Sequence, residues 1–324
     1  MATAPILVTG ATGFLGAQLV RRLVADGHRV RIFRRERSHL NILQQIAYEE
    51  AIGDIADPVA VDRAVAGCRA VFHCAALIAY WEHLNALQTA TNVEGTRHVV
   101  TASLRHGVAR LIHVSSVSAI GLRADGAPAD ESVLFNLGRL RLNYADTKFA
   151  AECVVRDGVA RGLDAVIINP GTIYGPGDHR RAYYVRSLAS PVTSRGGMAV
   201  VDVDDVVEGA IRAWQHGRCG KRYILAAENR TYCEIGKRFA AALQRRGPLW
   251  VMPRWLIRVA AAVIAPLGRL FRRPWALTPT MARVAHLRFF FDNTKSCREL
   301  GMTYRPFTAT AARTIAWMRE ERLV

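Results

Sequence analysis

The stretch TGATGFLG, residues 9–16, joins a strand-like run to a helix-length run. The apolar run Ile6–Thr9 leads into it, and Phe14–Ala25 has the spacing of an amphipathic helix. Glycines at such a junction let the backbone approach a pyrophosphate at the N-terminus of the helix. Their GxxGxxG spacing differs from the commoner GxGxxG, and a tight strand-to-helix turn also uses glycine. The stretch alone therefore leaves two interpretations open, a dinucleotide site and a tight connection.

The same alternation of strand-like and helix-like runs continues to about residue 170 and predicts an α/β fold with a Rossmann-type, doubly wound parallel sheet. We expect strands at 6–9, 29–33, 70–73, 110–114 and 164–169, a further strand ending at 52–53, and helices at 14–25, 58–66, 87–106 and 144–161. Residues 117–143 look irregular. Beyond the sheet we expect helices at 206–216, 233–245 and 255–264, the last ending before Pro266, and an extended segment at 222–225.

Composition places the 324 residues among globular proteins, with 51% hydrophobic residues and a net charge of +17. Residues 212–324 hold 22 basic and 6 acidic side chains, so +16 of that charge lies in the last third. Two explanations of this excess stay open: an arginine bias of the coding sequence, and a partner or surface that the charge contacts. The six cysteines lack CxxC spacing, and few residues precede the first strand, so we expect no metal site and a cytoplasmic protein.

Further motifs follow the glycine turn in order: Gly53-Asp54-Ile55, His73-Cys74-Ala75-Ala76 and Asn92-Val93-Glu94-Gly95-Thr96. Together they resemble the extended (atypical) short-chain dehydrogenase/reductases, also called the NAD-dependent epimerase/dehydratase family, over nearly the whole chain. The resemblance implies an NAD(P)-dependent enzyme. It implies cofactor contacts from Gly10, Thr12, Gly13, Phe14, Leu15, Gly16, Asp54, Ile55, Ala75, Ala76 and Asn92.

The candidate catalytic residues are Tyr144, Lys148 and Ser116. Tyr144 and Lys148 are four residues apart, so a helix places them on one face, where the ammonium can lower the pKa of the phenol. Such a hydroxyl can donate a proton to a developing alkoxide, or accept one in the oxidative direction. A solvated helix face is the alternative reading of this spacing. By resemblance Ser116 binds the substrate oxygen, with Ser115 and Ser118 as the alternatives, and Tyr144 and Lys148 also contact the cofactor.

Charge at the end of the second strand favours NADP(H) over NAD(H). An NAD site has an acidic residue there for the ribose hydroxyls, whereas an NADP site has arginine for the 2′-phosphate. This chain has Arg34 and Arg35, and Glu36 lies beyond the predicted strand end. The alternative is that these arginines bind no phosphate and form a solvated surface cluster of an arginine-rich protein.

The segment after the sixth strand, Asn169-Pro170-Gly171-Thr172, resembles the family segment beside the nicotinamide, so Pro170, Gly171 and Thr172 are expected cofactor contacts. The family usually has arginine where this chain has Asn169. In the later run 197–206, Asp205 is expected to cap the next helix. We expect an NADP-binding unit at 1–168, with 199–226 returning to it, and a smaller substrate lobe at 169–198 and 227–324.

The resemblance is closest to dihydroflavonol reductases, steroid dehydrogenase-like proteins and hopanoid-associated sugar epimerase-like proteins. It implies ketone reduction, or alcohol oxidation, on a largely apolar small molecule. An epimerase or dehydratase that retains its cofactor is the alternative, and a non-catalytic NADP-sensing module is a third. A sugar nucleotide stays open because four arginines follow the sixth strand: Arg180, Arg181, Arg186 and Arg195.

Residues 249–277 combine aromatic side chains with arginines but contain no uncharged run long enough to span a membrane. Peripheral contact with an anionic membrane is one interpretation, and a helix capping the active site with its apolar face is the other. Nucleic-acid-binding signatures are not recognised. By resemblance, a homodimer would pair through helices at 87–106 and 144–161.

Overall fold

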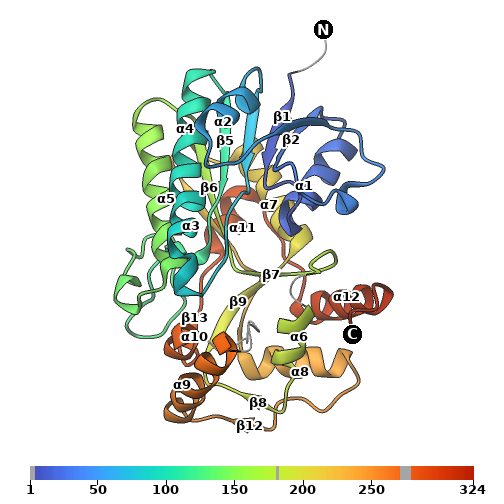
Figure 1. Ribbon diagram of the computed structural model, residues 1–324, viewed down its shortest axis with the longest axis vertical. Helices are drawn as coiled ribbons and strands as arrows, with labels where there is room; N and C mark the ends of the chain where they lie inside the picture. Colours follow the sequence, from blue (N-terminus) through green and yellow to red (C-terminus); the bar gives the residue numbers. More distant parts are fainter. Residues whose placement is uncertain (1–3, 180–181, 271–278) are drawn as a thin grey trace.

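The computed structural model describes residues 4–179, 182–270 and 279–324, so Arg180, Arg181, Phe271 and Trp275 lie outside the described residues. A seven-stranded parallel sheet forms the upper half of the molecule (Figure 1). Its strands are β1 (Ile6–Thr9), β2 (Val30–Arg34), β3 (Glu49–Ile52), β4 (Ala70–His73), β5 (Arg110–Val114), β6 (Ala165–Pro170) and β10 (Arg222–Leu225). They are ordered β10-β6-β5-β4-β1-β2-β3, which is the expected Rossmann-type arrangement.

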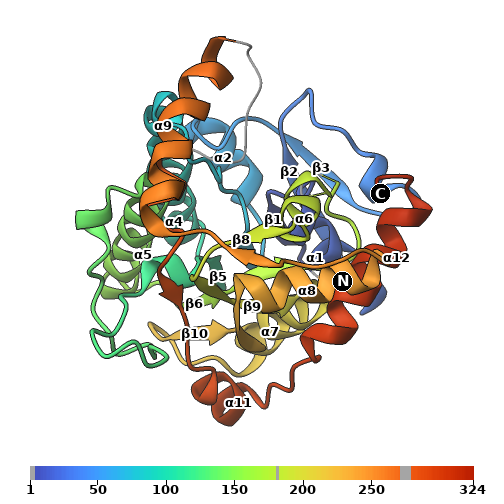
Figure 2. The same ribbon diagram turned by 90° about the horizontal axis from the view of Figure 1, so that it is seen from below.

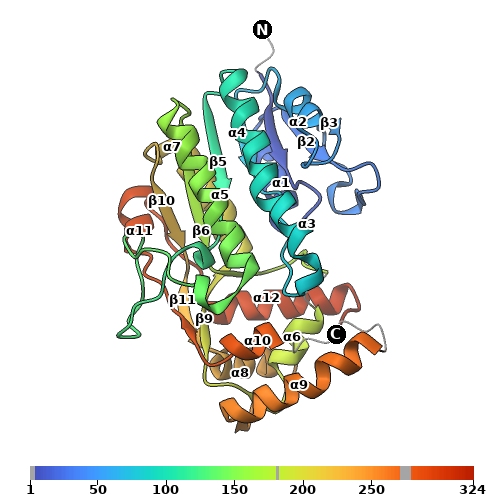
Figure 3. The same cartoon turned by 60° about the vertical axis from the view of Figure 1, so that its left-hand side comes forward.

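Helices cover both faces of this sheet. Those of the upper half are α1 (Phe14–Ala25), α2 (Pro58–Val65), α3 (Asn85–Thr89), α4 (Gly95–Arg105), α5 (Asn143–Ala160), α7 (Val203–His216) and α11 (Thr294–Leu300). Helices α2, α4 and α5 pack on one face, with α4 beside α5, whereas α1 and α7 pack together on the other (Figure 3). Two apolar cores result, one on each side of the sheet.

The lower half contains two smaller sheets and the remaining helices (Figures 1 and 3). One sheet joins β7 (Thr172–Tyr174), β9 (Gly197–Asp202), β11 (Glu228–Thr231) and β13 (Arg288–Phe289), and β8 (Val192–Thr193) pairs with β12 (Trp250–Val251). The helices are α6 (Ala182–Leu188), α8 (Tyr232–Ala242), α9 (Arg254–Leu270), α10 (Pro279–Val284) and α12 (Phe307–Glu320). Within 199–226, β9 belongs to the lower sheet, whereas α7 and β10 return to the upper one. The division into two units remains a prediction.

Two predicted helices differ from the observed ones. The helix expected at 87–106 is interrupted by a π-helical turn, Ala90–Glu94, between α3 and α4. The helix expected to end before Pro266 continues as α9 to Leu270. Single-turn π segments often occur at functional sites, and this one carries Asn92.

Asp205 was expected to cap α7, and this prediction is wrong. The helix begins at Val203, so Asp202 is the capping residue and accepts a hydrogen bond from the Asp204 amide at 3.0 Å. The carboxylate of Asp202 is fully buried and also binds Thr310 and Arg313 of α12. Asp205 instead accepts a hydrogen bond from the amide of Arg305. Residues 202–205 therefore hold the start of α7, a helix of the upper half, against the C-terminal segment that contains α12.

Candidate active site

The predicted site segments meet at one edge of the upper sheet because each follows the carboxyl end of a parallel strand. The glycine turn follows β1, Arg34 ends β2, Asp54 follows β3, and the 74–76 segment follows β4. Ser116 follows β5, and Pro170 ends β6, with Gly171 and Thr172 directly after it. The strand order reverses between β1 and β4, and ligands of open parallel sheets bind at such a reversal.

The glycine turn has one open position. A Cβ on Gly10, whose φ is +66°, would lie 2.7 Å from the Ala75 nitrogen, and a Cβ on Gly16 would overlap the Gly10 carbonyl oxygen. A Cβ on Gly13 would meet only the Gly10 oxygen, at 3.2 Å. Thr12, Phe14 and Leu15 are half-buried around it. The first amide groups of α1 lack intrahelical partners, so the turn fits a pyrophosphate.

A buried chain of hydrogen bonds supports this turn from behind. The Thr9 hydroxyl lies 2.8 Å from His73 Nδ1 and accepts a hydrogen bond from the Ala75 amide. His73 Nε2 lies 3.0 Å from the hydroxyl of Thr96, which donates to the Asn92 carbonyl. Since Thr96 donates onward, His73 donates from Nε2 and accepts at Nδ1 as a neutral ring. Ala75 and Ala76 are half-buried beside the turn.

At the end of β2 the two arginines differ. Arg34 binds Glu50 of the neighbouring chain segment, with its Nε and Nη2 atoms 2.9 and 2.5 Å from one carboxylate oxygen. Arg35 is exposed and takes part in no ion pair with the described residues. Asp54 is exposed and accepts a hydrogen bond from the Ala56 amide, while Ile55 is buried against Gly95. Arg34, one of the two arginines expected to bind the 2′-phosphate, is therefore already paired with the carboxylate of Glu50.

Asn92, an expected cofactor contact, holds a loop in this structure, and its contact with a cofactor stays a prediction. Both amide protons are engaged, one by the Leu77 carbonyl and the other by the Thr147 hydroxyl, and its oxygen accepts from the Leu77 amide. Gln88, which the sequence did not single out, binds the same loop and accepts a hydrogen bond from Asn143. The π-helical turn therefore fixes the loop before Tyr80, whose ring lies 6.1 Å from that of Tyr144.

Lys148 is almost completely buried, one helical turn after Tyr144 on α5. Its Nζ donates to the Val114 carbonyl at 2.9 Å, at the end of β5. Burial lowers the pKa of Lys148 to about 8, opposed by nearby Cys74 and Glu152. Tyr144 is half-buried at the start of the same helix. The lysine thus ties the helix that carries Tyr144 to the strand that leads to Ser116.

The hydroxyls of Ser115 and Ser116, two of the three candidate serines, have different partners. The Ser115 hydroxyl donates to buried Glu152 at 2.7 Å, so its proton is engaged. The Ser116 oxygen accepts a hydrogen bond from the Ser118 amide at 3.1 Å, in a partly exposed position. A hydroxyl that accepts one hydrogen bond keeps its own proton to donate. The geometry favours Ser116 over Ser115 as a donor to a ligand.

Glu152 is a residue that the sequence interpretation missed. Its carboxylate is fully buried and accepts hydrogen bonds from Ser115, from Asn169 at 2.6 Å and from Arg156 at 2.6 Å, while Arg222 lies 3.3 Å away. Asn169 also donates to the Ser116 carbonyl at 2.9 Å. The signal was present in the sequence, because Tyr144, Lys148 and Glu152 follow one another at intervals of four on one helix.

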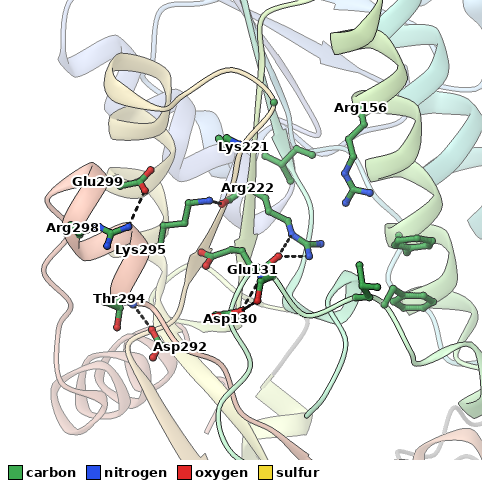
Figure 4. A pocket seen from close by; sticks show the side chains of 16 residues that line it. Asp130, Glu131, Arg156, Lys221, Arg222, Asp292, Thr294, Lys295, Arg298 and Glu299 are labelled. Carbon is green, nitrogen blue, oxygen red and sulfur yellow. Dashed lines mark hydrogen bonds and ion pairs between the residues drawn. The ribbon is translucent and has the colours of Figure 1, made fainter. Parts of the chain in front are cut away.

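A cavity of about 740 Å³ lies at the outer edge of β10, away from the glycine turn (Figure 4). Arg156 and Arg222 line it, and Arg222 also donates to the Glu131 carbonyl, which covers the strand edge. Both arginines contact Glu152. The buried charge is therefore neutralised from the side of this cavity.

Two buried histidines beside Lys148 are held neutral. Burial, with a smaller effect of the Lys148 charge, lowers the pKa of His73 to about 3. Burial, His73 and Lys148 lower the pKa of His113 well below its usual value. The rings lie 5.4 Å apart. Protonation of either ring would put a second charge beside a buried ammonium.

These pKa shifts predict that the folded protein becomes less stable as the pH falls. Below pH 6.5 the unfolded chain protonates both histidines while the folded chain does not, so the free energy of unfolding falls by about 2 kcal/mol per histidine between pH 7 and pH 5. Denaturant titrations should show His113→Leu with a shallower pH dependence than wild type. His39→Gln, at an exposed position, is the control. An unchanged pH dependence in His113→Leu would contradict the assignment.

A sequence profile of the NAD dependent epimerase/dehydratase family matches residues 6–226. The chain is 32% identical to sterol demethylase protein B of Methylococcus capsulatus, covering 98% of this chain and 99% of that protein. It is 30% identical to the 3 beta-hydroxysteroid dehydrogenase/isomerase of Mycobacterium tuberculosis, covering 94% and 87%.

A solved structure, that of gox2253, superposes with a TM-score of 0.85 and 33% identity, covering 98% of this chain and 99% of the other. The profile, the full-length relatives and the parallel sheet with its glycine turn agree with the resemblance drawn from the motifs. The protein is an enzyme of the NAD(P)-dependent kind, and its chain belongs to the NAD-dependent epimerase/dehydratase family, within the extended short-chain dehydrogenases/reductases.

Proposed function

We propose that this protein is an NADPH-dependent ketoreductase that acts on a largely apolar, polycyclic ketone through Ser116, Tyr144 and Lys148. One observation carries the proposal. The buried ammonium of Lys148 binds the end of β5 and lies one helical turn from Tyr144, so α5 carries a phenol and an ammonium beside the strand that leads to Ser116. Carbonyl reduction needs a proton donor and a donor of hydrogen bonds to the oxygen.

Each residue has one task in this reaction. When bound, the dinucleotide would supply the hydride that the carbonyl carbon of the ketone accepts. The Tyr144 hydroxyl gives its proton to the carbonyl oxygen, which becomes the alcohol. Ser116 donates a hydrogen bond to the same oxygen, because its own oxygen is already occupied by the Ser118 amide. The Lys148 ammonium stabilises negative charge that develops on Tyr144 as the proton leaves.

Aromatic side chains near Tyr144 support an apolar substrate. Ile78 and Tyr80 are exposed in the loop held by Asn92, and the ring of Tyr80 approaches Tyr144. Tyr232 of α8 lies near Tyr80 and Tyr184, and burial raises its pKa. Two relatives named for sterol or steroid chemistry extend over most of the chain. We therefore expect a first screen for substrates to find activity among 3-ketosteroids.

Removing the Tyr144 hydroxyl should abolish turnover without removing the cofactor site. With a 3-ketosteroid and NADPH, Tyr144→Phe should lower kcat by roughly 10²- to 10⁴-fold, the usual contribution of a general acid. Affinity for NADPH, measured by nucleotide fluorescence, should change little. Tyr48→Phe, in a partly buried position outside the catalytic set, is the matched control. Wild-type activity in Tyr144→Phe would overturn the catalytic assignment.

Preference for NADPH rests on Arg35 in this proposal, since Glu50 binds Arg34. An exposed guanidinium at the end of β2 suits the 2′-phosphate, and charge-assisted hydrogen bonds of this kind are the strong ones. The NADP(H) preference is a proposal, since NAD is the nucleotide in the name of the family.

Charge changes at the end of β2 and on β3 should alter nucleotide preference in opposite directions. Arg35→Ala should weaken NADPH binding roughly 10- to 100-fold while leaving NADH binding nearly unchanged. Glu50→Gln should strengthen NADPH binding, because it frees Arg34. Titration calorimetry with both nucleotides gives the comparison, and Arg105→Ala, exposed on α4, is the control. Equal loss of NADPH and NADH affinity in Arg35→Ala would contradict the assignment.

An epimerase or dehydratase with the same residues is the second candidate, because the family profile includes these activities. Such an enzyme returns the hydride to its substrate and keeps its nucleotide bound. Arg186, one arginine that could have met a sugar nucleotide, contacts the Leu323 carbonyl instead. Purification with NAD already bound and no net oxidation of NADPH would favour this candidate. The homodimer stays a prediction.

A further inference from the structure

Helix α9 and the β8–β12 pair lie at the lower end of the molecule (Figure 1), which Figure 2 shows from below. Both elements carry exposed apolar side chains. On α9, Trp255, Val259 and Val263 are 66%, 52% and 57% exposed, at intervals of four, so they form one stripe. We call these three residues the α9 stripe. Further exposed apolar residues at this end are Val192, Leu249, Trp250 and Val251.

The stripe is not the face by which α9 packs on the protein. Ile257 and Ala261 are buried, at 6% and 2% exposure, and form a small core with Ala282. Helix α9 therefore has an inner apolar face, which it buries, and an outer apolar face, which it leaves exposed. An amphipathic helix of a soluble domain normally has polar residues outside. Exposed apolar residues gathered in this way usually mark an interaction site.

The sequence interval that contains the stripe carries charge of one sign. From residue 235 to residue 291 the sequence contains no Asp or Glu. The same interval contains Lys237, Arg238, Arg245, Arg246, Arg254, Arg258, Arg269, Arg272, Arg273, Arg283 and Arg288. Arg254 and Arg258 are exposed on α9 itself, and with burial they lower the pKa of His286. The partner of this surface must therefore be apolar and negatively charged.

An anionic lipid bilayer has both properties. Interfacial helices combine aromatic or aliphatic side chains, which enter the acyl boundary, with Lys or Arg at the lipid headgroups. Within the described ranges, no helix is long and apolar enough to cross a bilayer. Contact would therefore be peripheral.

We propose that the α9 stripe docks this protein on anionic membranes, with Trp255, Val259 and Val263 entering the interfacial region and Arg254 and Arg258 binding headgroup phosphates. This surface is separate from the catalytic residues at the edge of the upper sheet. It therefore does not rest on the ketoreductase assignment.

Vesicle co-sedimentation of the full-length protein tests this docking. The protein should pellet with vesicles of phosphatidylcholine mixed with phosphatidylglycerol, and far less with phosphatidylcholine alone. Arg254→Gln/Arg258→Gln should weaken binding to the anionic vesicles about 30-fold, since each cation near the surface contributes about a factor of five. Trp255→Ser/Val259→Ser should weaken it at least about tenfold through lost apolar burial.

Matched controls distinguish docking through the α9 stripe from non-specific effects of positive charge and of exposed apolar surface on vesicle binding. Leu134→Ser removes an apolar side chain that is 83% exposed elsewhere, and Arg97→Gln/Arg105→Gln removes two exposed cations on α4. Both should bind vesicles as wild type does, and all variants should keep wild-type NADPH affinity. Failure to pellet with anionic vesicles, or unchanged binding of Trp255→Ser/Val259→Ser, would overturn the proposal. Lipid-free self-association lost in that variant would assign the stripe to a second copy of the chain instead.

Discussion

The arrangement of the site depends on the hydrogen bonds and ion pairs that the buried carboxylate of Glu152 makes. A charge with no solvent exposure is tolerated only when other groups satisfy it, and here Ser115, Asn169 and two arginines do so. These partners come from the ends of β5 and β6, from α5 itself and from β10. Satisfying one carboxylate therefore fixes the helix that carries Tyr144 and Lys148 against the strand that leads to Ser116.

The cofactor side of the same edge is fixed by close backbone packing. Gly10 leaves no room for a side chain where the turn meets the 74–76 segment, and Gly16 leaves none where α1 meets the Gly10 carbonyl. The Thr9–His73–Thr96 chain supports the 74–76 segment from behind. Asn92 then joins this half to α5 through Thr147. The two halves of the site are thus connected by buried hydrogen bonds, which keep their geometry because no water competes for them.

Local sequence patterns predicted the parts of the protein that local physics determines. The glycine turn, the alternating strands and the Tyr144–Lys148 pair depend on spacing along the chain, and the fold and family predicted from them are confirmed. Partners distant in sequence were not predicted. The Glu152–Asn169 contact and the Arg34–Glu50 pair need the tertiary fold, and the Asp205 cap was misplaced because α7 begins three residues earlier than its apolar spacing indicated.

The most direct test of this account is the pH dependence of kcat/KM for ketone reduction in wild type and in Glu152→Gln, with Glu94→Gln at an exposed ion pair as control. Glutamine keeps an acceptor for Ser115 and Asn169 but removes the negative charge that opposes the burial of Lys148. The account predicts an alkaline limb near pH 8 in wild type, which moves to lower pH in Glu152→Gln because the ammonium then loses its proton more readily. The same limb in both proteins, or a shift to higher pH, would contradict it.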